Sequence, residues 1–448
     1  MPVQMQRRYP YQPHLIVFPK PPFSAAFSVF GAEFPSVHIL IKGAVLMEIL
    51  QKVVRGMSLI VQKYGGSSVK DSQRLYHVAR RLAEQFRLGN QMVVVLSAQG
   101  KTTDSLIEKA QEITDKASGR EMDVLLSTGE QLSVSLMAMA LGQLGCKAVS
   151  LCGWQVGIHT NGTHQNARIL QVDTERIRKH LEQGMIVLVA GFQGISEDGD
   201  ITTLGRGGSD TTAVALAAAL KADRCQIFTD VEGVYTADPR LVPEAVKWQE
   251  ISYNDMLVMA SMGAKVLHDR SVELAKDQQV CLEVLSSLSN APGTLVRYQR
   301  ETQPMLRGIT ADNSTLCYRL ENITLENAGR LMMTLYRRDV RPDLTEQPAP
   351  LQLFFTVPEH DRQTVNETLS ELSLSAEVDE SRSKVTLIGS GLHSIPNLKQ
   401  ELNTALQNEN IPLGSTWLGE RRYSVLVPRE QSTEAIEALH RVLLRHQS

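Results

Sequence analysis

The stretch Leu59-Ile-Val-Gln-Lys-Tyr-Gly-Gly-Ser-Ser-Val69 decides the fold class, because a strand pattern, a glycine turn and the start of a helix follow one another directly. It opens with a short run rich in Val and Ile, which is typical of a strand buried on both faces. A helical pattern then covers residues 70–88. The stretch therefore predicts a strand–turn–helix unit, the repeating element of an α/β fold.

The same alternation continues through the region 58–298. The expected strands are Leu59–Gln62, Met92–Leu96, Ala148–Leu151, Met185–Ala190 and Gln226–Thr229, with a last short strand at Thr294–Arg297. The expected helices lie near 70–88, 104–117, 129–144, 174–183 and 211–221. This pattern predicts a mainly parallel sheet sandwiched by helices. Ligands of such sheets bind beyond the carboxyl ends of the strands, so the loops there are the expected site.

Two smaller α+β modules are expected after this region, at 305–378 and 379–448. The second contains strand patterns at Lys384–Ile388 and Tyr423–Pro428, each followed by a helical pattern, near 395–409 and 431–445.

The N-terminal segment 1–57 is expected to be an extension outside the fold. Residues 1–56 hold seven of the 18 prolines and five of the ten phenylalanines, but no Asp. Arg7 and Arg8 suggest an organellar targeting peptide as the alternative, although the prolines would break its amphipathic helix. We expect the functional chain to open at Met57.

The amino-acid composition excludes some classes of binding partner. The net charge is −3, the pI is about 6.4 and no block of Lys or Arg occurs, which argues against nucleic acid or an anionic membrane as the main partner. No run of 18 apolar residues predicts a transmembrane helix. Five scattered cysteines without a C-x-x-C pair give little support to disulfides or a zinc site, and they fit a reducing cytoplasm.

Two glycine loops carry the candidate chemistry. Lys63-Tyr-Gly-Gly-Ser-Ser-Val69 can bring backbone N–H groups and a lysine to a phosphate, although a plain strand–helix turn explains its glycines equally well. The second loop is Thr202-Thr-Leu-Gly-Arg-Gly-Gly-Ser-Asp-Thr-Thr212. A helix N-cap at Ser209 or Asp210 explains one residue but leaves Arg206 and three glycines unexplained, so function is favoured.

A third loop, Phe228-Thr-Asp-Val-Glu-Gly-Val-Tyr-Thr-Ala-Asp-Pro-Arg240, is acidic but lacks calcium-loop spacing. The common nucleotide motifs are missing. Gly100-Lys101-Thr102 has Val95 where a P-loop needs glycine, and neither G-x-G-x-x-G nor the protein-kinase signatures occur. The sequence therefore indicates phosphate chemistry outside those folds.

Five motifs in order make the chain resemble the aspartokinase (aspartate 4-kinase) family of amino-acid kinases, from about residue 58 to 297. They are Lys63-Tyr-Gly-Gly-Ser-Ser-Val69, Leu-Ser-Thr-Gly-Glu130, Leu-Gly-Arg-Gly-Gly-Ser-Asp210, Thr-Asp-Val-Glu-Gly-Val-Tyr-Thr-Ala-Asp-Pro-Arg240 and Met262-Gly-Ala-Lys-Val-Leu-His268. The family's paired ACT domains match the two C-terminal modules in length and placement. The resemblance implies ATP-dependent phosphorylation of the L-aspartate side chain to 4-phospho-L-aspartate, the first step toward lysine, threonine and methionine.

The resemblance also assigns residues. It implies catalytic roles for Lys63, Asp210, Gly65 and Gly66. The implied aspartate site comprises Ser97, Thr103, Glu130, Phe192, Arg206 and Ser209. The implied ATP site comprises Lys63, Thr229, Asp230, Tyr235, Arg240 and Lys265. Mg²⁺ would be held by the ATP phosphates and water, with no protein ligands, and the ACT domains would form a homodimer or a higher homo-oligomer.

Two departures from the family lie in the regulatory half, at Gly389-Ser-Gly-Leu-His393 with Pro396-Asn397, and at Thr416-Trp-Leu-Gly-Glu420. They predict a pathway-dedicated paralogue with weak or altered feedback. Two alternatives remain: an amino-acid kinase with another acceptor, such as glutamate, acetylglutamate or a nucleotide, and a non-catalytic amino-acid sensor. Glu130 with Arg206 favours an α-amino acid over the first, and Lys63, Arg206 and Asp210 together favour an enzyme over the second.

Overall fold

The computed structural model describes residues 58–114, 116–264, 266–301 and 303–447. The predicted extension 1–57, with Met57, lies outside these described residues.

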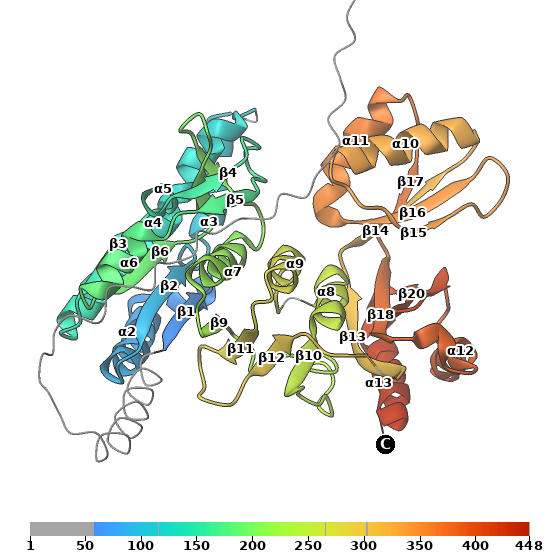
Figure 1. Cartoon of the computed structure of the whole chain (residues 1–448). Coiled ribbons are helices and arrows are strands. Elements are labelled where there is room, and N and C mark those ends of the chain that lie inside the picture. Colours follow the sequence, from blue (N-terminus) through green and yellow to red (C-terminus); the bar gives the residue numbers. More distant parts are fainter. Residues whose placement is uncertain (1–57, 115, 265, 302, 448) are drawn as a thin grey trace, which may run out of the picture. The chain divides into compact units, whose positions relative to one another are not determined.

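The large sheet has eight strands in the order β10-β12-β11-β9-β1-β2-β6-β3 (Figure 1). Their bounds are β1 Leu59–Tyr64, β2 Gln91–Leu96, β3 Ala148–Leu151, β6 Ile186–Ala190, β9 Arg224–Thr229, β10 Glu250–Ser252, β11 Leu282–Ser286 and β12 Thr294–Arg297. Every neighbouring pair is parallel except β11 and β12. The prediction of a mainly parallel sheet is confirmed.

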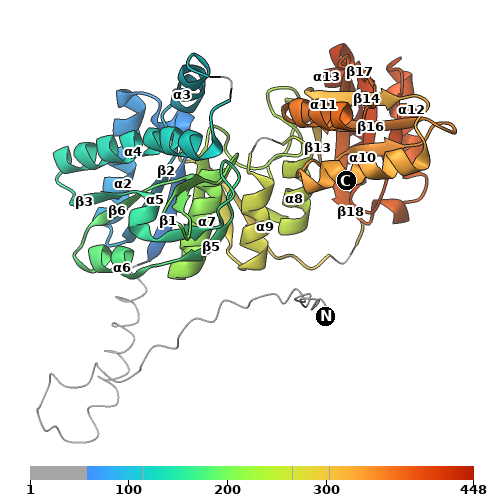
Figure 2. The same ribbon diagram turned by 90° about the horizontal axis from the view of Figure 1, so that it is seen from above.

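Helices cover both faces of this sheet (Figure 2). In β2, Met92, Val94 and Leu96 face the apolar cluster that holds α2 (Ser72–Arg87) and α4 (Gly119–Gln143), while Val93 and Val95 face the cluster of α6 and α7. The remaining helices of this region are α3 Thr102–Gln111, α5 Gly153–Val156, α6 Glu175–Glu182, α7 Gly208–Leu220, α8 Tyr253–Ser261, α9 Asp269–Asp277 and the 3-10 turn η1 Gly66–Val69. Apolar side chains alternate between the faces, so the sheet is buried on both.

Helix α4 differs most from expectation, since it begins at Gly119 rather than near residue 129. Ser118 caps it by accepting the N–H of Glu121, and Ser-x-x-Glu is a capping-box pattern that marks a helix start. Helix α3, in turn, ends at Gln111, short of the predicted residue 117. On length and composition alone α4 could cross a membrane, but half of its most apolar window is buried inside the structure. It packs as a core helix, with Met137 and Leu141 fully buried.

A small four-stranded sheet of order β5-β4-β7-β8 was not predicted. Its strands are β4 Ile158–Thr160, β5 Ile169–Val172, β7 Gln193–Ile195 and β8 Ile201–Thr203. Three or four residues are too few to show a period-two pattern in the sequence.

The C-terminal region forms two antiparallel sheets with helices. One has the order β15-β16-β14-β17, and the other β13-β18-β20-β19. The strands are β13 Met305–Asp312, β14 Thr315–Leu320, β15 Asp343–Glu346, β16 Leu353–Pro358, β17 Glu377–Asp379, β18 Arg382–Ser390, β19 Thr416–Leu418 and β20 Arg422–Pro428. The helices are α10 Leu325–Arg337, α11 Arg362–Glu371, α12 Leu398–Asn408 and α13 Ser432–Gln447, with 3-10 turns η2 Glu359–Asp361, η3 Leu392–Ser394 and η4 Arg429–Gln431.

The expected division into consecutive modules at 305–378 and 379–448 is wrong for β13. This strand pairs with β18 along most of its length, from Met305 opposite Ser390 to Asp312 opposite Lys384. The first module is therefore inserted between two strands of the second. The apolar pattern of β13 fits either sheet, so the sequence alone could not assign it.

Candidate active site

The carboxyl ends of the central strands meet at one edge of the large sheet. Tyr64 at the end of β1 pairs with Leu96 of β2 on one side and with Phe228 of β9 on the other. The rings of Tyr64 and Phe228 are stacked, with centroids 4.5 Å apart. Leu96 in turn pairs with Ala190 of β6. The loops that begin at residues 65, 97, 191 and 230 therefore leave the sheet side by side.

Lys63 and Asp210 meet at this edge. Lys63 is the next-to-last residue of β1, and Asp210 lies in the first turn of α7. Lys63 Nζ is 2.6 Å from Asp210 Oδ1, and the two side chains are only 13% and 11% exposed. A carboxylate in the first turn of a helix is stabilised by the helix dipole. The pair thus fixes an ammonium group next to Gly65, the first glycine of the loop after β1.

Of the two glycines in that loop, Gly66 is required by close approach. A Cβ on Gly65 would make only an ordinary contact, 3.5 Å from Lys63 Nζ. A Cβ on Gly66 would lie 2.5 Å from the carbonyl oxygen of Ala98, where no side chain fits, and the Gly66 carbonyl accepts the N–H of Gly100 at 3.1 Å. The loop after β1 is thereby packed onto the loop after β2, which carries Ser97.

Glu130 is buried in α4 beside the same loop and is only 3% exposed. Its Oε1 accepts the N–H of Ala98 at 3.0 Å, but its Oε2 has no partner among the described residues. Burial raises the pKa of Glu130 to about 7, against the opposing effect of the Ala98 hydrogen bond. A buried, unpartnered carboxylate oxygen calls for a ligand that donates hydrogen bonds or carries positive charge.

The second glycine loop presents Arg206 to solvent. Gly205 and Gly207 have φ angles of 75° and 70°, in the left-handed region that favours glycine. A Cβ on Gly207 would lie 2.2 Å from His268, so this turn is pressed against the start of α9. Arg206 is exposed between the two glycines.

Ser209 and Phe192 lie where this loop meets the end of β6. A Cβ on Gly191 would approach Ser209 Oγ to 2.7 Å, and Phe192 takes a left-handed φ of 70°. That conformation costs energy in a bulky residue and is held here by two hydrogen bonds. The Phe192 N–H donates to Thr212 Oγ1 at 3.1 Å, and its carbonyl accepts the Leu204 N–H at 2.8 Å.

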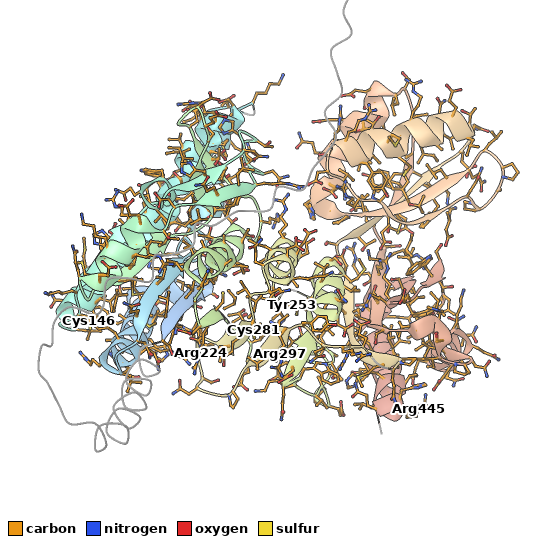
Figure 3. The ribbon with its side chains drawn as sticks, in the orientation of Figure 1. Cys146, Arg224, Tyr253, Cys281, Arg297 and Arg445 are labelled. Carbon is orange, nitrogen blue, oxygen red and sulfur yellow. The ribbon has the colours of Figure 1, made fainter. Side chains whose placement is uncertain are left out.

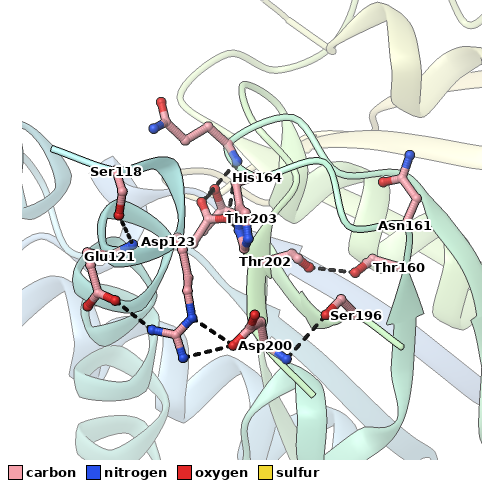
Figure 4. A network of polar contacts seen from close by, with 12 residues as sticks. Ser118, Glu121, Asp123, Thr160, Asn161, His164, Ser196, Asp200, Thr202 and Thr203 are labelled. Atoms are coloured by element: carbon pink, nitrogen blue, oxygen red, sulfur yellow. Dashed lines mark hydrogen bonds and ion pairs between the residues drawn. The ribbon is translucent and has the colours of Figure 1, made fainter. Parts of the chain in front are cut away.

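A polar network behind this loop was missed by the sequence analysis (Figure 4). Asp123 of α4 is fully buried and accepts a hydrogen bond from Thr203 Oγ1 at the end of β8. Its carboxylate also accepts the Gln165 N–H at 3.1 Å and lies 2.7 Å from His164 Nδ1. Asp123 and Glu130 are seven residues apart, about two helical turns, and therefore lie on the same face of α4. The predicted helix, 129–144, begins after Asp123, so the sequence pattern does not place the two residues together.

The predicted nucleotide residues follow β9. Thr229 ends the strand, and its Oγ1 donates to Asp230 at 3.1 Å. Tyr235 is half-buried and forms an isolated bridge with Lys247. Arg240 is exposed and forms a bidentate pair with Asp238, which holds the pKa of Asp238 below its usual range. The predicted residue Lys265 lies outside the described residues.

The loop residues fall into two groups. Lys63 contacts Gly65 and Asp210, while Gly66 and Glu130 both approach Ala98, which follows Ser97. Phe192 packs against Gly208, which precedes Ser209. Arg206 is exposed, Thr229 and Asp230 lie at the end of β9, and Thr103 lies in the first turn of α3. Tyr235 and Arg240 stand farther along the chain, in a segment that contacts the large sheet at Thr294 and the C-terminal region through Ala237 and Val242.

The opposite edge of the sheet carries a different set of side chains. Arg224 begins β9 and Cys281 immediately precedes β11, so both mark the amino ends of their strands (Figure 3). All five cysteines, which lie among the described residues, are free thiols.

Comparison with known proteins places this geometry in a family. Residues 58–286 match the amino acid kinase family. The aspartokinase of Geobacillus stearothermophilus is 44% identical over 393 residues, which cover 86% of this chain and 97% of the relative. Aspartokinase 2 of Bacillus subtilis is 44% identical over 396 residues, with the same coverage.

Solved structures agree. E. coli aspartokinase III in complex with aspartate and ADP, in the R-state, is 26% identical, and the match covers 86% of this chain and 100% of that one with a TM-score of 0.75. Its T-state complex with lysine and aspartate is 27% identical and matches 86% and 99% with a TM-score of 0.67. The chain belongs to the aspartokinases, within the amino acid kinase family.

Proposed function

We propose that the edge formed by the loops after β1, β2, β6 and β9 binds Mg-ATP and L-aspartate and transfers the γ-phosphoryl group to the aspartate side chain. The products are ADP and 4-phospho-L-aspartate. The Lys63–Asp210 pair, 2.6 Å apart at the end of the central strand, is the observation that carries the proposal. It supplies a fixed positive charge where a phosphoryl group can reach both the glycine loop and an amino-acid site.

The chemistry needs charge stabilisation more than proton transfer. An aspartate side chain with a pKa near ~3.9 is already ionised at neutral pH, so the nucleophile needs no general base. The barrier is the approach of a carboxylate to a polyanionic phosphate, which cations and N–H donors lower. Lys63 and the backbone N–H groups of Gly65 and Gly66 supply these, and Asp210 holds the lysine in place.

The amino-acid substrate needs one site for each of its charges. Glu130, with its unpartnered Oε2, is suited to the α-ammonium group, and the exposed fork of Arg206 is suited to the α-carboxylate. Ser97, Thr103, Phe192 and Ser209 complete the aspartate site. This pairing would select an α-amino acid over a plain dicarboxylate.

The nucleotide side of the proposal comprises Lys63, Thr229, Asp230, Tyr235, Arg240 and Lys265. Mg²⁺ accompanies ATP as part of the substrate, held by phosphate oxygens and water, which suits an ion that keeps several of its waters. We also propose a cytoplasmic homodimer or higher homo-oligomer, formed through the C-terminal modules. The free thiols support a reducing compartment.

We propose that regulation of this enzyme differs from that of E. coli aspartokinase III, whose T-state structure contains lysine and aspartate. The altered stretch Thr416-Trp-Leu-Gly-Glu420 includes β19, where the Trp417 ring lies 4.7 Å from the Arg422 guanidinium carbon. A Cβ on Gly419 would come within 2.1 Å of the Trp417 ring, so that glycine is needed for the turn. We infer weak inhibition by lysine and threonine, or a response to another metabolite bound at these modules.

The test is release of ADP from Mg-ATP with L-aspartate, with the acyl phosphate trapped as its hydroxamate. We expect aspartate-dependent hydroxamate from the full chain and its loss in Lys63→Ala. The matched control is Lys109→Ala on the exposed side of α3, which should keep normal turnover. Turnover only with another acceptor, or none in the wild type, would contradict the proposal. Repeating the assay with lysine, threonine and both tests regulation, and normal-strength inhibition would overturn that part.

A further inference from the structure

The nucleotide-side loop shares its apolar core with the C-terminal region. Ala237 and Val242, which flank Asp238 and Arg240, are 4% and 1% exposed. They belong to the same apolar cluster as Leu306 of β13 and Leu439 of α13. This cluster is the core of the module built on β13, β18 and β20, not that of the large sheet. The C-terminal module therefore holds the loop from Thr236 onward, whereas Val234, directly before Tyr235, lies in the core of the large sheet and donates its N–H to Thr294 Oγ1 of β12 at 2.9 Å.

Thr236, directly after Tyr235, is the polar centre of this contact and is fully buried. Within the loop, its backbone N–H donates to the Val246 carbonyl and its Oγ1 accepts the Val246 N–H, both at 2.9 Å. Toward the module, its carbonyl accepts the N–H of Ile309 in β13 at 2.7 Å. Its Oγ1 also lies 2.8 Å from Nε2 of His440 in α13.

His440 is 2% exposed, so its imidazole has little access to water. Burial lowers the pKa of His440, against the opposing effect of Glu244. The fold therefore favours the neutral imidazole. Thr236 Oγ1 accepts the Val246 N–H and keeps its own proton and a second lone pair, so it can hydrogen-bond Nε2 of either neutral imidazole tautomer. A buried hydrogen bond of this kind is worth more for the geometry it fixes than for its net stability.

We propose that His440 is a positioning residue for nucleotide binding, which fixes Tyr235 and the following loop through its hydrogen bond to Thr236. The inference rests on the proposed assignment of Tyr235 and Arg240 to the ATP site. Through this hydrogen bond, α13 of the C-terminal module contacts the loop that carries the proposed nucleotide residues Tyr235 and Arg240. A displacement of α13 would change the affinity for ATP before that for aspartate, because the aspartate-site residues Glu130 and Arg206 are carried by α4 and by the loop before α7.

The test compares full-chain variants His440→Ala, His440→Gln and Thr236→Val with the control His446→Gln. His446 lies on the same helix but pairs with Glu401, far from Thr236 in the hydrogen-bond network. KM for Mg-ATP and for L-aspartate come from the hydroxamate assay, and Kd for Mg-ADP comes from calorimetric titration. Thermal unfolding provides Tm.

His440→Ala and Thr236→Val should raise KM for ATP and Kd for ADP by about three- to tenfold, the range expected for one lost hydrogen bond. KM for aspartate should stay within about twofold, and the double variant should be no worse than the worse single one, because both remove the same interaction. His440→Gln, whose amide can still meet the threonine hydroxyl, should recover most of the affinity. His446→Gln should bind ADP like the wild type.

A purely structural role would lower Tm and the active fraction while leaving both KM values and Kd unchanged, and that result would overturn the proposal. An equal rise of both KM values would overturn it as well. Should His440→Ala not fold, an unchanged Kd for ADP in Thr236→Val has the same consequence. A wild type without aspartate-dependent turnover would instead refute the proposed function, and the ADP titration would still test His440.

Discussion

Replacing Asp123 by alanine should destabilise the protein and weaken aspartate binding, because this carboxylate holds three segments together. It is fully buried and accepts from Thr203 and the Gln165 N–H, with His164 Nδ1 at 2.7 Å. Thr203 is itself only 1% exposed, so the variant leaves its hydroxyl buried without an acceptor.

The magnitude follows from those partners. One buried, unsatisfied donor costs about 1–3 kcal/mol, and each partner that water can replace costs about 0.5–1 kcal/mol more. With two such partners, the Gln165 N–H and His164, the expected loss in the free energy of unfolding is therefore about 2–5 kcal/mol. For a domain of this size, each kcal/mol lowers Tm by about 2–4 °C.

The functional effect should appear in KM for aspartate. A Cβ on Gly205 would lie 3.0 Å from the Gln165 carbonyl, so the segment that Asp123 holds packs directly against the turn carrying Arg206. Urea unfolding and the hydroxamate assay measure the two effects. KM for ATP should change less, since the proposed nucleotide residues lie in β1 (Lys63) or from the end of β9 onward, and none of them contacts Asp123.

Asp200→Ala is the matched control, since Asp200 lies close by, in a separate group of contacts with Arg120 and Ser196 (Figure 4). Its partner Arg120 is 50% exposed and Asp200 is 31% exposed, and such pairs contribute at most about 1 kcal/mol. Equal Tm values for Asp123→Ala and Asp200→Ala would refute the reasoning from burial.

Three further outcomes are expected. Burial raises the pKa of Glu130 to about 7, and only its carboxylate form attracts an ammonium group. KM for aspartate should therefore rise about tenfold as the pH is lowered from about 8 to about 6. A pH-independent KM would contradict this, and Glu130→Gln should abolish the pH dependence. Asp210→Asn should lower kcat by about 100-fold and should also lower Tm, because Lys63 loses its fixed partner and its nearly buried ammonium group is left without a counter-charge. Gly207→Ala should lower Tm and raise KM for aspartate, because the new Cβ would collide with His268. Gly145 has a similar φ of 75° but no atom within 4 Å of a Cβ built on it, so Gly145→Ala should lower Tm less. Equal decreases in Tm for the two variants would rule out the clash as the cause.

The large sheet could be predicted from the sequence because its strands are continuous apolar runs. Ala148–Leu151 and Thr294–Arg297 match β3 and β12 at both ends, whereas β1 extends two residues farther, to Tyr64. Lys63 and Tyr64 were placed outside the strand because a charged and a polar aromatic residue end the apolar run. Pairing with neighbours on both sides overrides that local signal.

Much of the candidate site depended on contacts that no local pattern encodes. Lys63, Arg206 and Asp210 stand in recognisable glycine loops, and the structure brings Lys63 and Asp210 together. Asp123 belongs to no motif, and its partners His164 and Thr203 come from loops and a three-residue strand. The Ser118-x-x-Glu121 cap was a usable signal, and it would have placed Asp123 and Glu130 on one helix.

The pairing of β13 with β18 has a consequence for how the chain acquires its structure. Asp312 and its hydrogen-bond partner Ser383 are 71 residues apart, so β13 must remain unpaired until the whole inserted module has been synthesised. Contacts of such sequence separation fold slowly and leave a strand edge exposed in the meantime. A chain that ends after β17 but before β18 would leave the edge of β13 permanently unpaired. It would also lack α13, so the Thr236 loop would lose its contact with His440. Premature termination there should therefore yield aggregates rather than an unregulated kinase.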